Sequence, residues 1–69
     1  MKKYLVSLET ANGRITREFL DYNLAVDKFE SFVKRFEELK RNGDKVHGVS
    51  IVAYHSGLWC HSETVKTHF

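Results

Sequence analysis

The sequence predicts an α+β fold: a single ββαββ domain over residues 1–69, with a mainly antiparallel four-stranded sheet and one helix packed on one face. Three observations predict it. Two β-like segments flank an Asn-Gly turn signal, a long amphipathic segment follows, and two further β-like segments close the chain. A helix on one side of an antiparallel sheet is the usual arrangement for such an order. The strand order beyond the two hairpins does not follow from the sequence.

The first hairpin is predicted from residues 3–10 and 15–22, which flank Asn12-Gly13. Both central residues of a type I′ turn need positive φ, which Asn and Gly tolerate. With these two as the loop, Leu8 pairs with Arg17 and Val6 with Phe19. One face is then the predicted core and carries Tyr4, Val6, Leu8, Ile15 and Phe19. The apolar residues expected on the other face are Leu5, Leu20 and Tyr22.

The segment 23–41 is predicted to be the helix. Its apolar residues recur at spacings of three and four, as expected for a stripe that faces a core: Ala25, Phe29, Phe32, Phe36 and Leu39, widened by Val26 and Val33. Asn23 or Asp21 can supply the N-cap oxygen, and Asn42-Gly43 offers a left-handed stop at the other end.

The second hairpin is predicted from residues 46–55 and 58–67, with a turn at Ser56-Gly57. If Val49, Ile51 and Ala53 face the helix, Val52 and Tyr54 fall on the other face. The length of this turn decides which face carries Trp59 and Cys60, and the sequence leaves that open.

The stretch YHSGLWCHSE, residues 54–63, raises the question of a metal site or a reactive thiol. Neighbouring strand residues point to opposite faces, so Cys60 and His61 cannot easily share one tetrahedral ion with His55. Cys60 is expected mid-strand, with no helix N-terminus in sequence to lower its pKa. We therefore expect no metal, no cofactor and no catalytic residue. A small zinc-dependent domain is the last of three interpretations, after the protein-binding and nucleic-acid-binding ones given below.

The composition places the protein among small globular domains. A hydrophobic content of 42% and a charged content of 29% argue against disorder, and a net charge of +2 is too weak to indicate nucleic acid by itself. The single cysteine forbids an internal disulfide, and no signal peptide or membrane span is apparent. We expect a soluble, cytoplasmic protein.

Basic residues gather toward the end of the predicted helix: Lys34, Arg35, Lys40 and Arg41. Neighbouring glutamates dilute them, so a solvated mixed face is the first interpretation. A nucleic-acid-binding module that uses this helix end is the alternative function.

A fold with one helix leaves one sheet face uncovered, and an apolar patch on that face would indicate a protein interface. Such a face would take either a foreign protein or a second copy of the chain in a homodimer. The expected anchors are apolar and mostly aromatic, namely Leu5, Leu20, Tyr22, Tyr54 and Trp59. The basic helix residues would steer an acidic partner.

Three segments, MKKYLVSLETANG, EFLDYNLAVDKFESFVKRF and VSIVAYHSGLW, together resemble a class of very small proteins encoded by bacteriophages and other mobile elements. Some members of that class are anti-CRISPR or other host-takeover inhibitors, which occlude a surface of a host protein complex. The resemblance implies a non-enzymatic binding role in the host cytoplasm. It transfers no functional residue, because the class shares no site.

Overall fold

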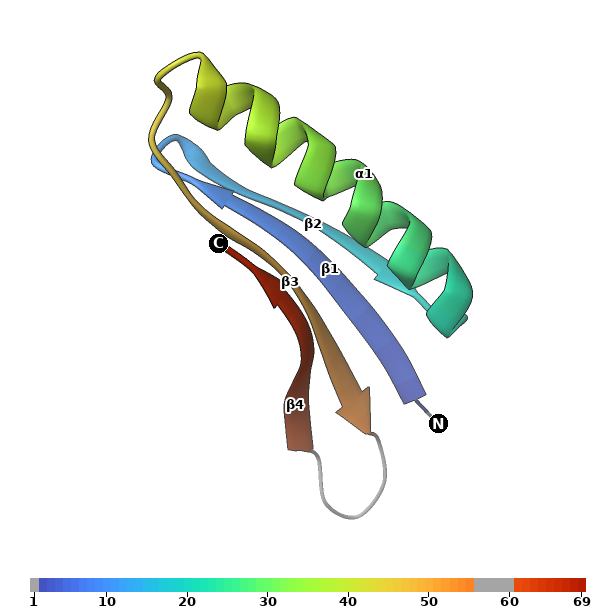
Figure 1. Ribbon diagram of the computed structural model, residues 1–69. Helices are drawn as coiled ribbons and strands as arrows, with labels where there is room; N and C mark the ends of the chain where they lie inside the picture. Colours follow the sequence, from blue (N-terminus) through green and yellow to red (C-terminus); the bar gives the residue numbers. More distant parts are fainter. Residues whose placement is uncertain (1, 56–60) are drawn as a thin grey trace.

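The computed structural model, shown in Figure 1, describes residues 2–55 and 61–69. In chain order its elements are β1 (Lys2–Thr10), β2 (Gly13–Phe19), α1 (Tyr22–Arg41), β3 (Val46–His55) and β4 (His61–His68). The strands form one open sheet in the order β2-β1-β3-β4, and each neighbouring pair is antiparallel. The helix packs on one face of this sheet, so the predicted α+β fold of ββαββ order is confirmed.

The register of the first hairpin differs by two residues from the predicted one. Thr10 pairs with Gly13, which makes Ala11-Asn12 the loop and places Leu8 opposite Ile15 instead of Arg17. No described residue other than glycine has a positive φ, so Asn12 does not adopt the left-handed conformation that a type I′ turn at Asn12-Gly13 requires. Gly13 takes the positive φ (140°) just after the loop. An even shift preserves which face each residue occupies.

The ends of α1 agree with the sequence signals. Asp21 is the N-cap, and its Oδ1 accepts a hydrogen bond from the Asn23 backbone N–H at 2.8 Å. At the other end Asn42 is the C-cap and Gly43 has φ 87°, the left-handed stop that the sequence predicts. The Gly43 N–H donates to the Lys40 carbonyl at 3.1 Å, which satisfies one of the last free carbonyls of the helix.

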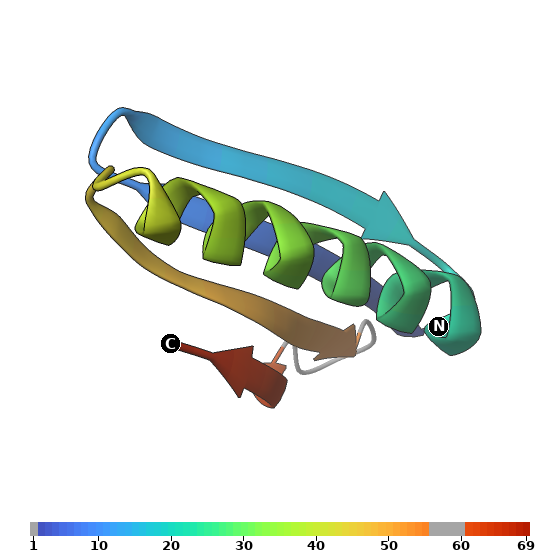
Figure 2. The same ribbon diagram turned by 45° about the horizontal axis from the view of Figure 1, so that its top comes forward.

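The core lies between α1 and the two central strands. Figure 2 shows the helix lying above β1, between β2 and β3, with β4 outside its cover. The buried apolar residues are Val6, Leu8, Ala25, Phe29, Phe32, Phe36, Val49, Ile51 and Ala53. Tyr4 and Phe19 pack at the margin of this core, whereas Ile15 is 46% exposed because it sits on the edge strand.

Two irregularities shape the second half of the sheet. The β1–β3 register shifts between Glu9 and Thr10, so that His47 forms a β-bulge before Gly48. The Phe69 ring approaches Gly48 so closely that a Cβ there would lie 3.0 Å from its Cδ1 atom. The β3–β4 register also shifts, at Val65. The predicted turn at Ser56-Gly57, with Trp59 and Cys60, lies outside the described residues.

Candidate functional site

The candidate site is the face of the sheet that points away from α1, which we call the open face. In the described part of the chain no element covers it (Figures 1 and 2). Three strands contribute alternate residues to a shallow hollow of about 330 Å³ on this face. The hollow is lined by Leu5, Ser7, Glu9, Arg14, Thr16, Ser50, Val52 and Tyr54.

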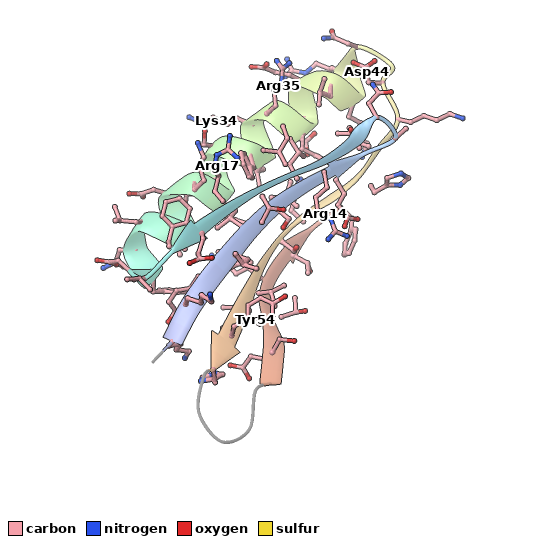
Figure 3. All side chains as sticks on the ribbon, turned by 180° about the vertical axis from the view of Figure 1, so that it is seen from behind. Arg14, Arg17, Lys34, Arg35, Asp44 and Tyr54 are labelled. Atoms are coloured by element: carbon pink, nitrogen blue, oxygen red, sulfur yellow. The ribbon has the colours of Figure 1, made fainter. Side chains whose placement is uncertain are left out.

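The apolar part of the open face is a small cluster on the two central strands. Leu5 and Val52 are direct cross-strand partners, and Tyr54 follows two residues after Val52 on the same strand. Tyr54 is 37% exposed, and Figure 3 labels it on β3. The prediction that Leu5, Val52 and Tyr54 share the uncovered face is confirmed. Their arrangement supplies one partly exposed aromatic ring beside two half-buried aliphatic side chains.

Hydroxyl side chains form a row across all four strands of the open face. Thr16, Ser7, Ser50 and Thr67 are successive cross-strand partners from β2 to β4. The Ser7 and Thr16 hydroxyl oxygens lie 3.3 Å apart, so one donates to the other. The open face therefore carries a continuous band of hydroxyl side chains beside its apolar cluster. Only the final register could reveal this row, because it aligns residues from four separate segments.

Two ion pairs flank the hollow on the β1–β2 side. The Arg14 guanidinium pairs with the Glu9 carboxylate on the neighbouring strand. The Lys3 Nζ lies 3.6 Å from a Glu18 carboxylate oxygen, and both side chains are about half exposed. Exposed ion pairs of this kind contribute little to the free energy of folding. Their main effect on this face is to place alternating positive and negative charges beside the hollow.

Two predicted anchors, Leu20 and Tyr22, do not line the hollow of the open face, and Tyr22 lies on the helix-covered side. The strand alternation that placed them on the open face stops at Phe19, the last residue of β2. Tyr22 is the first residue of α1, and its ring packs against Tyr4 on the helix-covered side with centroids 5.3 Å apart. Leu20 lies in the bend between β2 and α1 and is 65% exposed. The third aromatic anchor, Trp59, falls outside the described residues.

The basic residues of α1 do not form one continuous track. Lys34 and Lys40 lie about 120° apart around the helix, because they are six residues apart. Arg35 pairs with Glu38 at 3.6 Å, and the Lys40 ammonium lies 5.9 Å from the centroid of the Phe36 ring. The acidic residues predicted to dilute this cluster therefore do so, and a solvated mixed face is the better description.

A contact that the sequence does not predict connects β4 to the helix. The His68 Nε2 atom lies 2.7 Å from a Glu37 carboxylate oxygen, and the His68 ring meets the Phe36 ring edge-on at 5.2 Å. The hydrogen bond to His68 lowers the pKa of the Glu37 carboxyl below its ordinary value of 4.5. Neither Glu37 nor Phe36 is near His68 in the sequence, so spacing along the chain does not predict this contact. The interaction is structural in character, since it anchors an edge strand.

The described residues also contain no group of three or more His, Cys, Asp or Glu side chains that could hold a metal ion. His55 lies 3.9 Å from Glu63 across the β3–β4 pair. Cys60, the candidate thiol, lies outside this part of the chain. Among the described helices none has the length and apolar character to cross a membrane. The chain matches no protein-family model, no curated protein and no solved structure.

Proposed function

We propose that this protein is a non-enzymatic binding factor that acts by covering a surface of another protein with its open face. The observation that carries the proposal is the hollow in which Leu5, Val52 and Tyr54 form an apolar centre within a polar surround. Protein interfaces commonly combine an apolar core with a polar, hydrogen-bonding rim.

Tyr54 is the expected anchor of this contact. Tyrosine is enriched among the residues that dominate binding energy, because it adds a large apolar ring and one hydroxyl at a small entropic cost. The ring is 37% exposed and has Val52 and Leu5 beside it, so a partner side chain can pack on all three. Ser7, Thr16 and Ser50 add hydroxyls that adapt to donors or acceptors on the partner.

The resemblance to small phage and mobile-element proteins supports a host protein or protein complex as the partner, bound in the host cytoplasm. Binding without chemistry would inhibit or modulate that complex by occluding one of its surfaces. The basic residues near the end of α1, Lys34, Arg35, Lys40 and Arg41, would assist by steering an acidic partner toward the molecule.

The proposal is tested by capture of a partner from host lysate on immobilised protein. Three forms are compared: the unaltered chain, Tyr54→Ala, and Leu24→Ala as the matched control. Leu24 is 55% exposed on α1, so both variants remove an exposed apolar side chain from a folded surface. We expect Tyr54→Ala to weaken capture at least about tenfold, as expected for a central aromatic anchor, and Leu24→Ala to leave it unchanged.

Two outcomes would contradict the proposal. Equal capture by all three forms would place the interface away from the open face. Capture of nucleic acid, lost on nuclease treatment and falling steeply with salt, would instead support the alternative function at the basic end of α1.

A further inference from the structure

In the part of the chain that the structure describes, no strand pairs with the outer edge of β2. Six of the seven residues of β2, Gly13–Phe19, are exposed, and their register with β1 is regular throughout. The strand contains no proline and no bulge. The opposite edge strand, β4, has a register shift at Val65, and such a bulge blunts an edge against further pairing. Of the two edges, β2 is therefore the one prepared to accept another strand.

The direction of the free backbone groups on β2 follows from the hairpin. In a two-residue hairpin the residues that flank the loop, here Thr10 and Gly13, are a hydrogen-bonded pair. Alternation then points the N–H and C=O groups of Arg14, Thr16 and Glu18 away from β1. In agreement, the Thr16 carbonyl accepts a hydrogen bond from the Arg17 guanidinium at 2.9 Å, which covers the edge in the single copy.

We propose that β2 pairs with β2 of a second copy of this chain, antiparallel, about a twofold axis at Thr16. In this register Arg14 of each copy lies opposite Glu18 of the other, and the two Thr16 residues face each other. These are the three residues whose backbone groups point outward, so each facing pair can exchange both of its backbone hydrogen bonds. Pairing replaces the Arg17 side chain at the Thr16 carbonyl with a backbone N–H.

The charges along β2 favour a second copy of the chain as the pairing partner, with the twofold axis at Thr16. Moving the axis to Arg14 or Glu18 brings like charges together, and moving it to Arg17 sets two arginines opposite each other. Moving it to Ile15 leaves Arg14 opposite threonine, with no charge pair. Only the axis at Thr16 creates two opposite-charge pairs across the edge, and directly facing strand residues of opposite charge attract whereas like charges repel.

The ion pairs within each copy extend the same pattern. Arg14 already pairs with Glu9, and Glu18 with Lys3. Across the proposed interface the order of charges on the open face is Glu9, Arg14, then Glu18 and Lys3 of the second copy. The signs alternate along the whole row, so neither internal pair has to break when the strands join.

The geometry of the helix permits this pairing. In Figure 2 β2 lies to one side of α1, and the helix does not project over its outer edge. Figure 3 shows Arg17 extending from β2 on the helix side and Arg14 away from it, as the register requires. A twofold axis perpendicular to the sheet puts both helices on the same face. The two open faces then join into one continuous eight-stranded surface that presents Tyr54 twice.

The test uses sedimentation velocity on the full chain with Arg14→Glu, Glu18→Arg and an equimolar mixture of the two variants. In a dimer of either variant alone, positions 14 and 18 that face each other carry the same charge in both pairs. We expect self-association of each variant to weaken at least about tenfold. In the mixture every facing pair has opposite signs again, so a heterodimer should form. Thr16→Pro, which removes an outward N–H at an edge position where proline is tolerated, should also abolish pairing and leave the circular dichroism spectrum unchanged.

An unaltered chain that stays monomeric up to about millimolar concentration, the weak limit of specific association, would overturn the proposal. A dimer that persists in Thr16→Pro and in both charge variants would also overturn it, because the contact would then lie elsewhere, for example on the open face. Failure of the variant mixture to recover the dimer would refute the register at Thr16. None of these outcomes depends on whether a foreign partner binds Tyr54.

Discussion

Replacing Phe36 by alanine is the sharpest test of how the helix is held on the sheet. Phe36 is 2% exposed and is the largest fully buried side chain among the described residues. Its ring also packs against the His68 ring of β4 in a T-shaped contact, with centroids 5.2 Å apart. The substitution therefore opens a cavity under α1 and removes one of the contacts between the helix and the last strand.

The expected cost is a large share of the total stability. Truncating a buried phenylalanine to alanine costs about 3–5 kcal/mol, including the cavity that remains. Small domains are stable by about 0.05–0.15 kcal/mol per residue, which for 69 residues gives about 3–10 kcal/mol. We expect Phe36→Ala to lower the free energy of unfolding by about 3–5 kcal/mol, and the smaller truncation Phe36→Leu to lower it by about 1–2 kcal/mol.

Urea unfolding followed by circular dichroism measures both variants. Leu24→Ala is the matched control on the same helix, because Leu24 is 55% exposed and its loss should change the free energy of unfolding by less than about 0.5 kcal/mol. If Phe36→Ala cost no more than Leu24→Ala, the packing of α1 against β1 and β3 described above would be wrong.

Two further predictions concern the polar contacts of α1. The hydrogen bond from His68 lowers the pKa of Glu37 below 4.5, so the ionised carboxylate stabilises the fold above that pH, and this contribution disappears as the pH falls through the lowered pKa. Urea unfolding of Glu37→Gln between about pH 5 and 3 should show a shallower acid dependence than the unaltered chain, and an identical slope would contradict the contact. Asp21→Ala should cost about 1 kcal/mol through loss of the N-cap bond to the Asn23 N–H, while Asp21→Ser retains most of it. Equal stability of the alanine and serine variants would show that the side chain at position 21 does not stabilise α1 as an N-cap.

The sequence predicts those parts of the fold that depend on local periodicity. The spacing of Phe29, Phe32 and Phe36 predicts the buried stripe of α1, and the alternation of Val49 and Ile51 predicts the inner face of β3. Asp21 and Gly43 predict the ends of the helix to within a residue. In each case the determining forces act between residues close together in the chain.

Features that depend on the relative placement of distant segments could not be predicted. The exchange of the predicted Leu8–Arg17 pair for Leu8–Ile15 depends on the φ values of three loop residues. The central position of β1 beside β3 depends on how the helix covers the sheet, and the contact of His68 with Glu37 follows from it. Sequence spacing carries no information about such pairings.

The sequence predicts the open-face position correctly for residues inside a strand, where side chains alternate between the two faces of the sheet. Leu5 and Tyr54 lie on the open face, as their strand positions indicate. Tyr22 does not, because the chain leaves the strand at Phe19 and enters the helix, where a period of two no longer applies. The charge symmetry of β2 about Thr16 was present in the sequence, but its meaning depends on β2 being an edge strand.

Blocking the open face and then measuring partner capture tests directly whether this face binds the partner. Thr64 is exposed and lies opposite Val52, and Asp27 is exposed on α1. Thr64→Cys and Asp27→Cys are each made with Cys60→Ser, then conjugated to a maleimide polyethylene glycol. We predict that the conjugate at position 64 loses the captured partner and that the conjugate at position 27 keeps it. Capture that survives the first conjugate and fails with the second would contradict the assignment of the open face as the binding surface.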